Sequence, residues 1–131
     1  MPEEIRKEGL TKGKFYPCPE RPVCVSSMAP KNDKKHYMEP MTYSSSFEEA
    51  KEKIKKVVKS FNRTEIINEK DNYIHTTFTT FVFHFTDDVE FLIDDSEKVI
   101  HFKSQSRAGD YDWGKNKRRM KKVKKKFDEI K

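Results

Sequence analysis

The sequence lacks any long hydrophobic run, and no stretch approaches the ~18 consecutive apolar residues that a membrane-spanning helix needs. Its opening stretch, MPEEIRKEGLTKGKF, is charged throughout and lacks the apolar centre of a signal peptide. These absences lead us to expect a cytoplasmic protein, with the cell envelope as the alternative if an N-terminal signal or anchor was removed. Ten Phe, five Tyr and one Trp are too many large apolar groups for a disordered chain.

Cysteine is scarce. Cys18 and Cys24 are the two cysteines of the chain, and they lie close together in PCPERPVC. The pair lacks the further Cys or His residues that complete a zinc signature, and we expect no metal or other cofactor. The residues leave three states open, in decreasing order of preference: free thiols, a disulfide if the protein meets an oxidising compartment, and a metal site.

Glycine and proline are absent between Met41 and Ala108, and all six prolines lie at or before Pro40. We therefore predict that residues 1–35 form an irregular segment packed on the body of the protein. We call its PCPERPVC stretch, which contains Cys18 and Cys24, the Cys-Pro loop. Residues 36–131 are predicted to form a single α+β domain, which agrees with the length of 131 residues.

The uninterrupted region changes its hydrophobic period once. A weak first strand is predicted near 39–43, followed by a helix that Ser46 and Glu49, or Ser45 and Glu48, cap at its start. The apolar side chains that recur at helical spacing are Phe47, Ala50, Ile54, Val57, Val58 and Phe61. Beyond them, β-branched and aromatic residues indicate strands around Ile66, from Tyr73 to Phe85, in VEFLID and in VIHFKS, with turns at EKDN, TDD and DSEK.

The long stretch from Tyr73 to Phe85 changes phase. Ile74, Thr76 and Phe78 lie on one face of an extended chain, whereas the later phenylalanines, Phe81, Phe83 and Phe85, fall on the other face. A β-bulge near Thr79–Thr80 would return all of these side chains to one face, and we predict one there.

The C-terminal segment is basic on one side and apolar on the other. Ten Lys and Arg against three acids give residues 112–131 a net charge of +7, whereas the whole chain carries +6. The apolar residues at helical spacing are Trp113, Met120, Val123, Phe127 and Ile130, and Asn116 fills the gap between the first two. This stripe predicts a helix packed on the sheet from Trp113 onward. The preferred interpretation of this charge is a solvated outer face of the helix. The alternative is a surface that binds nucleic acid or another anionic surface.

Polar residues with candidate roles gather at the junction before this helix. Asp112 is placed to cap the helix, and Asn116 on the apolar stripe needs hydrogen-bond partners. Arg107 follows a half-buried strand, so it either pairs with an internal carboxylate or binds an anion. Asp88 and its neighbours Asp87 and Glu90 are the obvious partners of Arg107, or of Arg118 and Arg119. These three acids could instead hold a cation, but a turn followed by an outward-facing strand residue is the preferred interpretation.

Several strings occur together in one order: CPERPVCVSS, HYMEP, YIHTTF, DDVEFLID and SQSRAGDYDWGKNKRR. In that order they resemble an uncharacterised, mainly bacterial family, number 1499 among the catalogued domains of unknown function. The resemblance spans roughly residues 16–125, although Val23 replaces the usual Asn and the lysines after Arg119 are peculiar to this chain. It implies no assigned activity. Because many relatives carry an N-terminal anchor or signal, it favours an envelope location and a Cys18–Cys24 disulfide.

The order of the elements, β-α-β-β-β-β-α, predicts a two-layer α+β fold. An antiparallel sheet of about five strands would carry two helices on one face, in a layout like that of the TATA-binding protein. Such folds host unrelated functions, so the layout supports DNA binding only by analogy.

We carry three functional hypotheses forward. The first is a non-catalytic domain that binds a small anionic ligand or a protein partner, with its site near the CPERPVC loop and formed by Arg107, Asp88, Glu90, Asp112, Asn116, Arg118 and Tyr37. The second is binding of nucleic acid or an anionic membrane surface through Lys115–Lys126. The third, a hydrolase that uses Asp88 or Glu90 with Arg107, ranks last because the sequence shows no nucleophile or metal signature.

Overall fold

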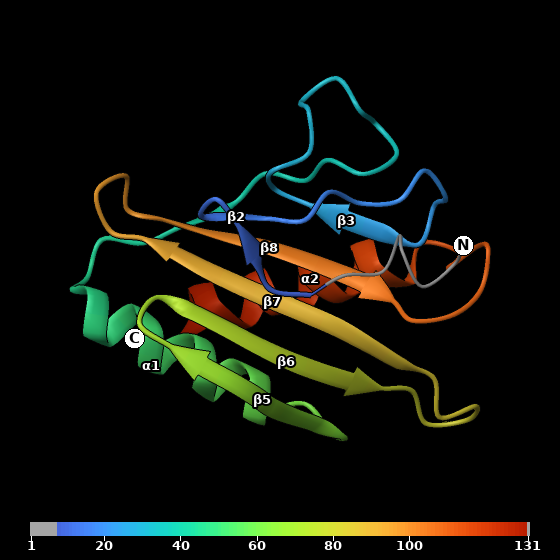
Figure 1. Cartoon of the computed structure of the whole chain (residues 1–131). Coiled ribbons are helices and arrows are strands. Elements are labelled where there is room, and N and C mark those ends of the chain that lie inside the picture. The colour runs from blue at the N-terminus through green and yellow to red at the C-terminus, as the bar shows by residue number, and fades with distance from the viewer. Residues whose placement is uncertain (1–7, 131) are drawn as a thin grey trace.

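A computed structural model describes residues 8–130 and has the two-layer α+β fold that the sequence predicts. Its main sheet has six strands, and the path β3-β8-β7-β6-β5 is antiparallel throughout, with β4 also paired to β8. Both helices, α1 (Phe47–Lys59) and α2 (Lys115–Glu129), lie behind the sheet in Figure 1. The strands of this sheet are β3 (Cys24–Ser26), β4 (Met41–Thr42), β5 (Thr64–Lys70), β6 (Tyr73–Thr79), β7 (Thr86–Asp94) and β8 (Val99–Ser106).

The core lies between the sheet and the two helices. Alternate residues of β7, namely Val89, Phe91 and Ile93, face this layer, because successive side chains of a strand point to opposite faces. Strands β6 and β8 contribute Ile74, Phe78, Ile100 and Phe102 to the same cluster. The even-numbered residues of β7 therefore face the other side of the sheet.

Helix α1 begins as its capping signal predicts. The Ser46 hydroxyl oxygen accepts a hydrogen bond from the Glu49 backbone N–H at 3.2 Å. The side chains that α1 buries are Ala50, Ile54, Val57 and Val58. The predicted face of this helix is therefore the one that contacts the sheet.

Helix α2 buries most of the predicted stripe, but the prediction for Trp113 is wrong. Met120, Val123 and Phe127 are buried, whereas Trp113 is 81% exposed. The helix begins only at Lys115, and Gly114 before it has a left-handed backbone with φ of 78°. That turn takes Trp113 out of helical phase. The architecture does not depend on Trp113, because the stripe inside the helix is enough to seat α2 on the sheet.

The predicted strand from Tyr73 to Phe85 is shorter than expected. Strand β6 ends at Thr79, and its register with β7 runs without a bulge, so the bulge predicted near Thr79–Thr80 is wrong. A loop of residues 80–85 follows and exposes the three later phenylalanines. Thr80 closes this loop, because its N–H donates to the Phe85 carbonyl at 2.9 Å and its hydroxyl accepts from the Phe85 N–H at 2.9 Å. The aromatic and β-branched composition indicated extended backbone, but it did not show which residues pair.

The predicted TDD turn is also wrong, because Thr86, Asp87 and Asp88 are the first residues of β7. Asp87 and Asp88 are buried and, as neighbours on a strand, point to opposite faces of the sheet. The irregularity of the sheet lies elsewhere, in the pairing of β5 with β6 between Ile66 and Asn68.

The N-terminal segment contains more regular structure than its composition indicates. A short hairpin of β1 (Leu10–Thr11) and β2 (Lys14–Phe15) crosses in front of the sheet in Figure 1, on the face opposite the helices. There Phe15 packs with Tyr73 and Leu92. Strand β3 of the same segment pairs with β8, which brings the Cys-Pro loop beside the end of β8. No helix within residues 8–130 is long and apolar enough to cross a membrane.

Candidate functional site

The polar residues of the β8–α2 junction converge on Asn116. This side chain is fully buried at the start of α2. The two hydrogens of its amide nitrogen are shared among three acceptors, Val23 O at 3.1 Å, Ser106 Oγ at 3.0 Å and Asp112 Oδ2 at 2.8 Å. Its amide oxygen accepts from Ser104 Oγ at 2.6 Å and Arg119 Nη1 at 2.8 Å. The prediction that Asn116 needs partners is confirmed, and these partners connect α2 to β8 and to the Cys-Pro loop.

Asp112 and Gly114 shape the turn that leads into α2. The Asp112 carboxylate accepts from the backbone N–H groups of Gly114 at 2.8 Å and Asn116 at 3.3 Å, so it caps the helix from two residues before the N-cap position. A Cβ atom at Gly114 would lie 2.9 Å from Arg118 Nη1, and φ at this residue is +78°. Only glycine fits here without strain, and Arg118 lies over it with Nη1 donating to Trp113 O at 2.7 Å.

Basic side chains from the first two turns of α2 line a cavity of about 330 Å³. Lys115, Arg118, Arg119 and Lys122 lie on one face of the helix because they are three and four residues apart. Arg63 joins them from the turn after α1, and the uncharged lining residues are Phe61, Asn62, Phe78 and Thr79. We call this cavity the basic pocket. Its lining contains five cationic side chains and no carboxylate.

A buried carboxylate lies beneath the basic pocket. Asp87 is fully buried and contacts Arg119 Nη2 at 2.7 Å and Lys115 Nζ at 3.0 Å. Arg119 also lies with its guanidinium carbon 5.1 Å from the Phe78 ring centroid. The predicted pairing of the acid cluster with Arg119 is thus confirmed. One carboxylate against five cations leaves a strong positive charge for an anion to meet.

The other predicted acids lie on the opposite face of the sheet. Asp88 receives two hydrogen bonds from Arg107, Nε to Oδ2 at 2.9 Å and Nη2 to Oδ1 at 3.0 Å. The His75 Nε2 lies 2.8 Å from the same carboxylate. Burial raises the pKa of Asp88, but the hydrogen bonds with His75 and Arg107 outweigh it and lower the pKa to about 2. Arg107 therefore forms the internal pair that the sequence predicts as one of its two roles.

Glu90 belongs to this second cluster. Its carboxylate accepts from the Tyr73 hydroxyl and from the Gly9 N–H at 2.6 Å, so the N-terminal segment covers it. Burial raises the pKa of Glu90 and lowers that of Lys103, which faces the same side of the sheet. Arg107 also borders a cavity of about 530 Å³ on this face, but Asp88 already neutralises its charge. The cluster is therefore a weaker site for an anion than the basic pocket.

The six main candidates thus form two groups. Arg107, Asp88 and Glu90 lie on the sheet face opposite the helices, and Asp112, Asn116 and Arg118 lie at the start of α2. Tyr37 forms an isolated bridge with Ser26, and within residues 8–130 no hydrogen bond or ring contact connects its side chain to either group. No group of three or more His, Cys, Asp and Glu residues in this part of the chain could hold a metal ion.

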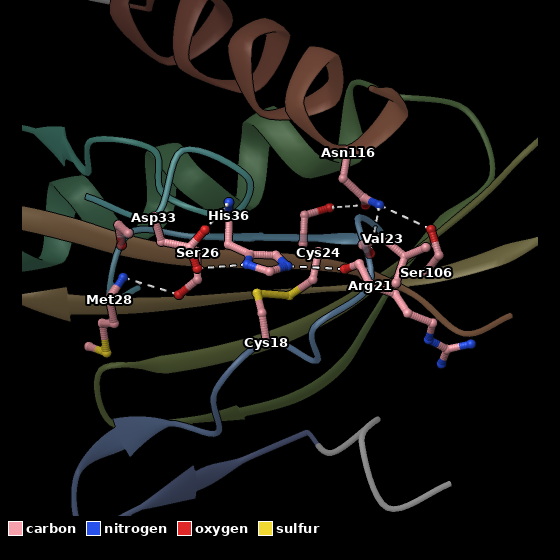
Figure 2. The surroundings of a disulfide bond; sticks show 12 residues. Cys18, Arg21, Val23, Cys24, Ser26, Met28, Asp33, His36, Ser106 and Asn116 are labelled. Carbon is pink, nitrogen blue, oxygen red and sulfur yellow. Dashed lines mark hydrogen bonds and ion pairs between the residues drawn. A yellow bond between two sulfur atoms is a disulfide. The ribbon is translucent and has the colours of Figure 1, made fainter. Parts of the chain in front are cut away.

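The Cys-Pro loop supports the junction. Cys18 and Cys24 form a disulfide, and Figure 2 shows Asn116 reaching from α2 to Val23 and Ser106 above it. The same loop accepts backbone hydrogen bonds from the junction: the Ser106 N–H donates to Val23 O at 2.9 Å and the Asp112 N–H to Pro22 O at 3.2 Å. The loop therefore fixes the strand end and the turn that position Asn116.

The sequence predicts Arg118 as a ligand-binding residue of the first hypothesis, and the Lys115–Lys126 face of the second hypothesis contains Lys115, Arg119 and Lys122 as well. The spacing of these four residues, three and four apart, places them on one side of that predicted helix. Arg63 gave no such signal. It reaches the pocket only because the turn after α1 lies beside the end of β6, where Arg63 Nε donates to Thr79 O at 3.2 Å.

A family model described as a protein of unknown function, DUF1499, matches residues 14–127 of the chain. No curated protein and no solved structure matches the chain significantly.

Proposed function

Because the chain belongs to the DUF1499 family, whose function is unknown, we propose a role from its own residues: it binds a small anionic ligand in the basic pocket. The observation that carries the proposal is that five cationic side chains line one cavity of about 330 Å³ without a carboxylate among them. Phosphate and carboxylate groups match the planar donors of Arg63 and Arg118, whose side chains are exposed.

The pocket supports binding rather than catalysis. Its lining contains no carboxylate, imidazole or thiol that could act as a general base or a strong nucleophile. Arg119 is held in place by Asp87 and Asn116 before any ligand arrives, so little side-chain freedom is lost when an anion binds. The aromatic side chains of Phe61 and Phe78 give the pocket an apolar wall for the rest of the ligand.

The alternative is binding of a polyanion, such as nucleic acid, along the outer face of α2. Four lysines, Lys117, Lys121, Lys124 and Lys125, are exposed there and lie outside the pocket lining. Such binding would involve many weak contacts, and its affinity would fall steeply with salt. The two proposals therefore differ in which cations they need.

The test is calorimetric titration of the protein with inorganic pyrophosphate. The pocket variant Arg118→Gln/Lys122→Gln is expected to weaken binding by about tenfold or more, because it removes two charge-assisted contacts. The control variant Lys121→Gln/Lys124→Gln removes the same charge from the same helix and should bind as the wild type does. Equal losses in both variants would refute a defined pocket and favour the polyanion.

The disulfide supports a location outside the reducing cytosol. Cys18 and Cys24 are paired, and disulfides persist mainly in oxidising compartments. The envelope is therefore the compartment we propose. The test is to isolate the protein from its own cells under conditions that block thiol–disulfide exchange, unfold it, and count its free thiols. We expect no free thiol, and two free thiols would contradict the proposed location.

A further inference from the structure

Exposed aromatic side chains gather at one end of the sheet. They come from two loops, 80–85 and 107–114, which lie at the same right-hand end of the molecule in Figure 1. Phe81 and Phe83 are each 71% exposed and Trp113 is 81% exposed. We call the following residues the aromatic surface: Phe81, Val82, Phe83, Phe85, Tyr111 and Trp113. They line one groove of about 530 Å³, and exposed apolar surfaces of this kind mark interaction sites.

The rings of the aromatic surface are held in place rather than loosely displayed. Phe83 stacks on Phe85 with centroids 5.5 Å apart, and Tyr111 stacks on Trp113 at 5.6 Å. His84 and Trp113 have φ values of 57° and 56°, a backbone conformation that residues other than glycine rarely adopt. Both loops therefore have defined shapes that direct apolar rings into solvent.

Cations border the aromatic surface. The Arg63 guanidinium lies 5.2 Å from the Phe81 ring centroid, and Lys115 Nζ lies 5.8 Å from that of Phe85. Both cations also line the basic pocket, so the two features are continuous. The nearby acids are engaged elsewhere: Asp110 pairs with Arg21, and Asp112 accepts backbone and Asn116 hydrogen bonds.

We propose that this end of the molecule docks on the surface of an anionic lipid bilayer. The aromatic rings enter the interfacial region, where amphipathic rings such as Trp and Tyr are most stable. The bordering cations meet the negative headgroups. A lipid phosphate would bind in the basic pocket, and this part of the proposal rests on the proposed function. The insertion of the aromatic surface into the bilayer does not depend on it. The docking face is the pair of loops and not the lysine-rich outer face of α2.

A bilayer fits this surface better than a protein partner does. The apolar side chains lie on two separate loops at the end of a sheet, next to a cavity that could hold a phosphate, and cations border them directly. A bilayer interface provides an apolar phase for the rings and, directly outside it, a dense layer of negatively charged headgroups for the cations.

Trp113 is the one tryptophan of the chain, so its fluorescence reports directly on the surface. We expect vesicles of phosphatidylglycerol and phosphatidylcholine to shift Trp113 emission to the blue, and lipids brominated near the headgroup to quench it. Vesicles of phosphatidylcholine alone should bind about tenfold or more weakly, because the cations then contribute little. If neither vesicle shifts the emission, the docking proposal is refuted, and pyrophosphate binding by the same protein would leave the proposed function intact.

Amino-acid substitutions distinguish the role of the aromatic surface from that of the basic pocket. Val82→Ser/Phe83→Ser should weaken vesicle binding by about tenfold for each apolar side chain removed, because burying one Val or Phe is worth at least this much. It should leave pyrophosphate binding unchanged, because neither side chain contacts a cation of the basic pocket. The control Ile67→Ser removes an exposed apolar side chain outside the aromatic surface and should bind vesicles as the wild type does. A blue shift that depends on protein concentration without lipid, together with a dimer mass by light scattering, would overturn the proposal in favour of a second copy of the chain.

Discussion

Replacing Asn116 with leucine tests whether the junction is held as the structure indicates. The substitution keeps a side chain of similar size but removes five hydrogen bonds, which join β8, α2, Asp112 and the Cys-Pro loop. The side chain is fully buried, so water cannot replace the lost partners. Asn116→Leu therefore leaves polar groups at the centre of the junction with fewer hydrogen bonds.

The expected loss can be worked out from those bonds. Each of the three neutral bonds contributes ~1 kcal/mol net, and the two to the charged Arg119 and Asp112 contribute ~1.5–3 kcal/mol each, which gives an upper figure of ~6–9 kcal/mol. Several partners keep a second hydrogen bond: Arg119 keeps Asp87, Asp112 keeps the Gly114 N–H, and Val23 O keeps the Ser106 N–H. We therefore expect Asn116→Leu to lower the free energy of unfolding by ~3–4 kcal/mol.

Urea denaturation, followed by circular dichroism, measures this difference. The matched control is Asn68→Leu, the same substitution at an exposed position of β5, which should change the free energy of unfolding by less than ~0.5 kcal/mol. A loss below ~1 kcal/mol for Asn116→Leu would refute the reasoning, because it would mean that these hydrogen bonds are not formed in solution.

Three further changes probe the supports of the site. Cys18→Ser/Cys24→Ser should lower the unfolding free energy in urea by ~2 kcal/mol, given the separation of 6 residues, and no change would mean that the disulfide is not formed. Gly114→Ala should lower the free energy of unfolding by ~1 kcal/mol or more and should weaken pyrophosphate binding, because the new Cβ would clash with Arg118. A wild-type stability and a wild-type affinity would contradict this. Asp88→Asn should lower the free energy of unfolding above pH ~4, because the ionised Asp88 carboxylate, whose pKa is lowered to about 2, stabilises the folded state there. In urea denaturation the difference between variant and wild type should vanish as the pH falls through about 2. A difference that does not depend on pH would contradict this.

Local patterns predicted the framework of the fold because each depended on residues close in sequence. The spacing of Ala50, Ile54 and Val57 gave the buried face of α1, and the alternation of Val89, Phe91 and Ile93 gave the buried face of β7. Neither pattern required knowledge of which strand pairs with which.

The candidate site was predicted only in its parts. The sequence indicated that Asp and Arg residues pair, but not that Asp87 and Asp88 serve opposite faces of the sheet, because TDD was read as a turn. The register of β7 decides which face of the sheet each acid lies on, and a shift by one residue would place Asp87 and Asp88 on each other's face. Trp113 was placed in the core because its spacing matched a helix that begins two residues later, after the left-handed Gly114.

The central claim is that an anion binds where Arg63, Arg118 and Arg119 meet. A pyrophosphate titration observed through the side-chain Nε–Hε signals of ¹⁵N-labelled arginine tests it most directly. We predict that these three signals shift together along one binding curve, while Arg107, paired with Asp88 on the opposite face, stays unchanged. Unchanged signals from the three pocket arginines, with shifts confined to backbone amides near Lys121, Lys124 and Lys125, would contradict the claim.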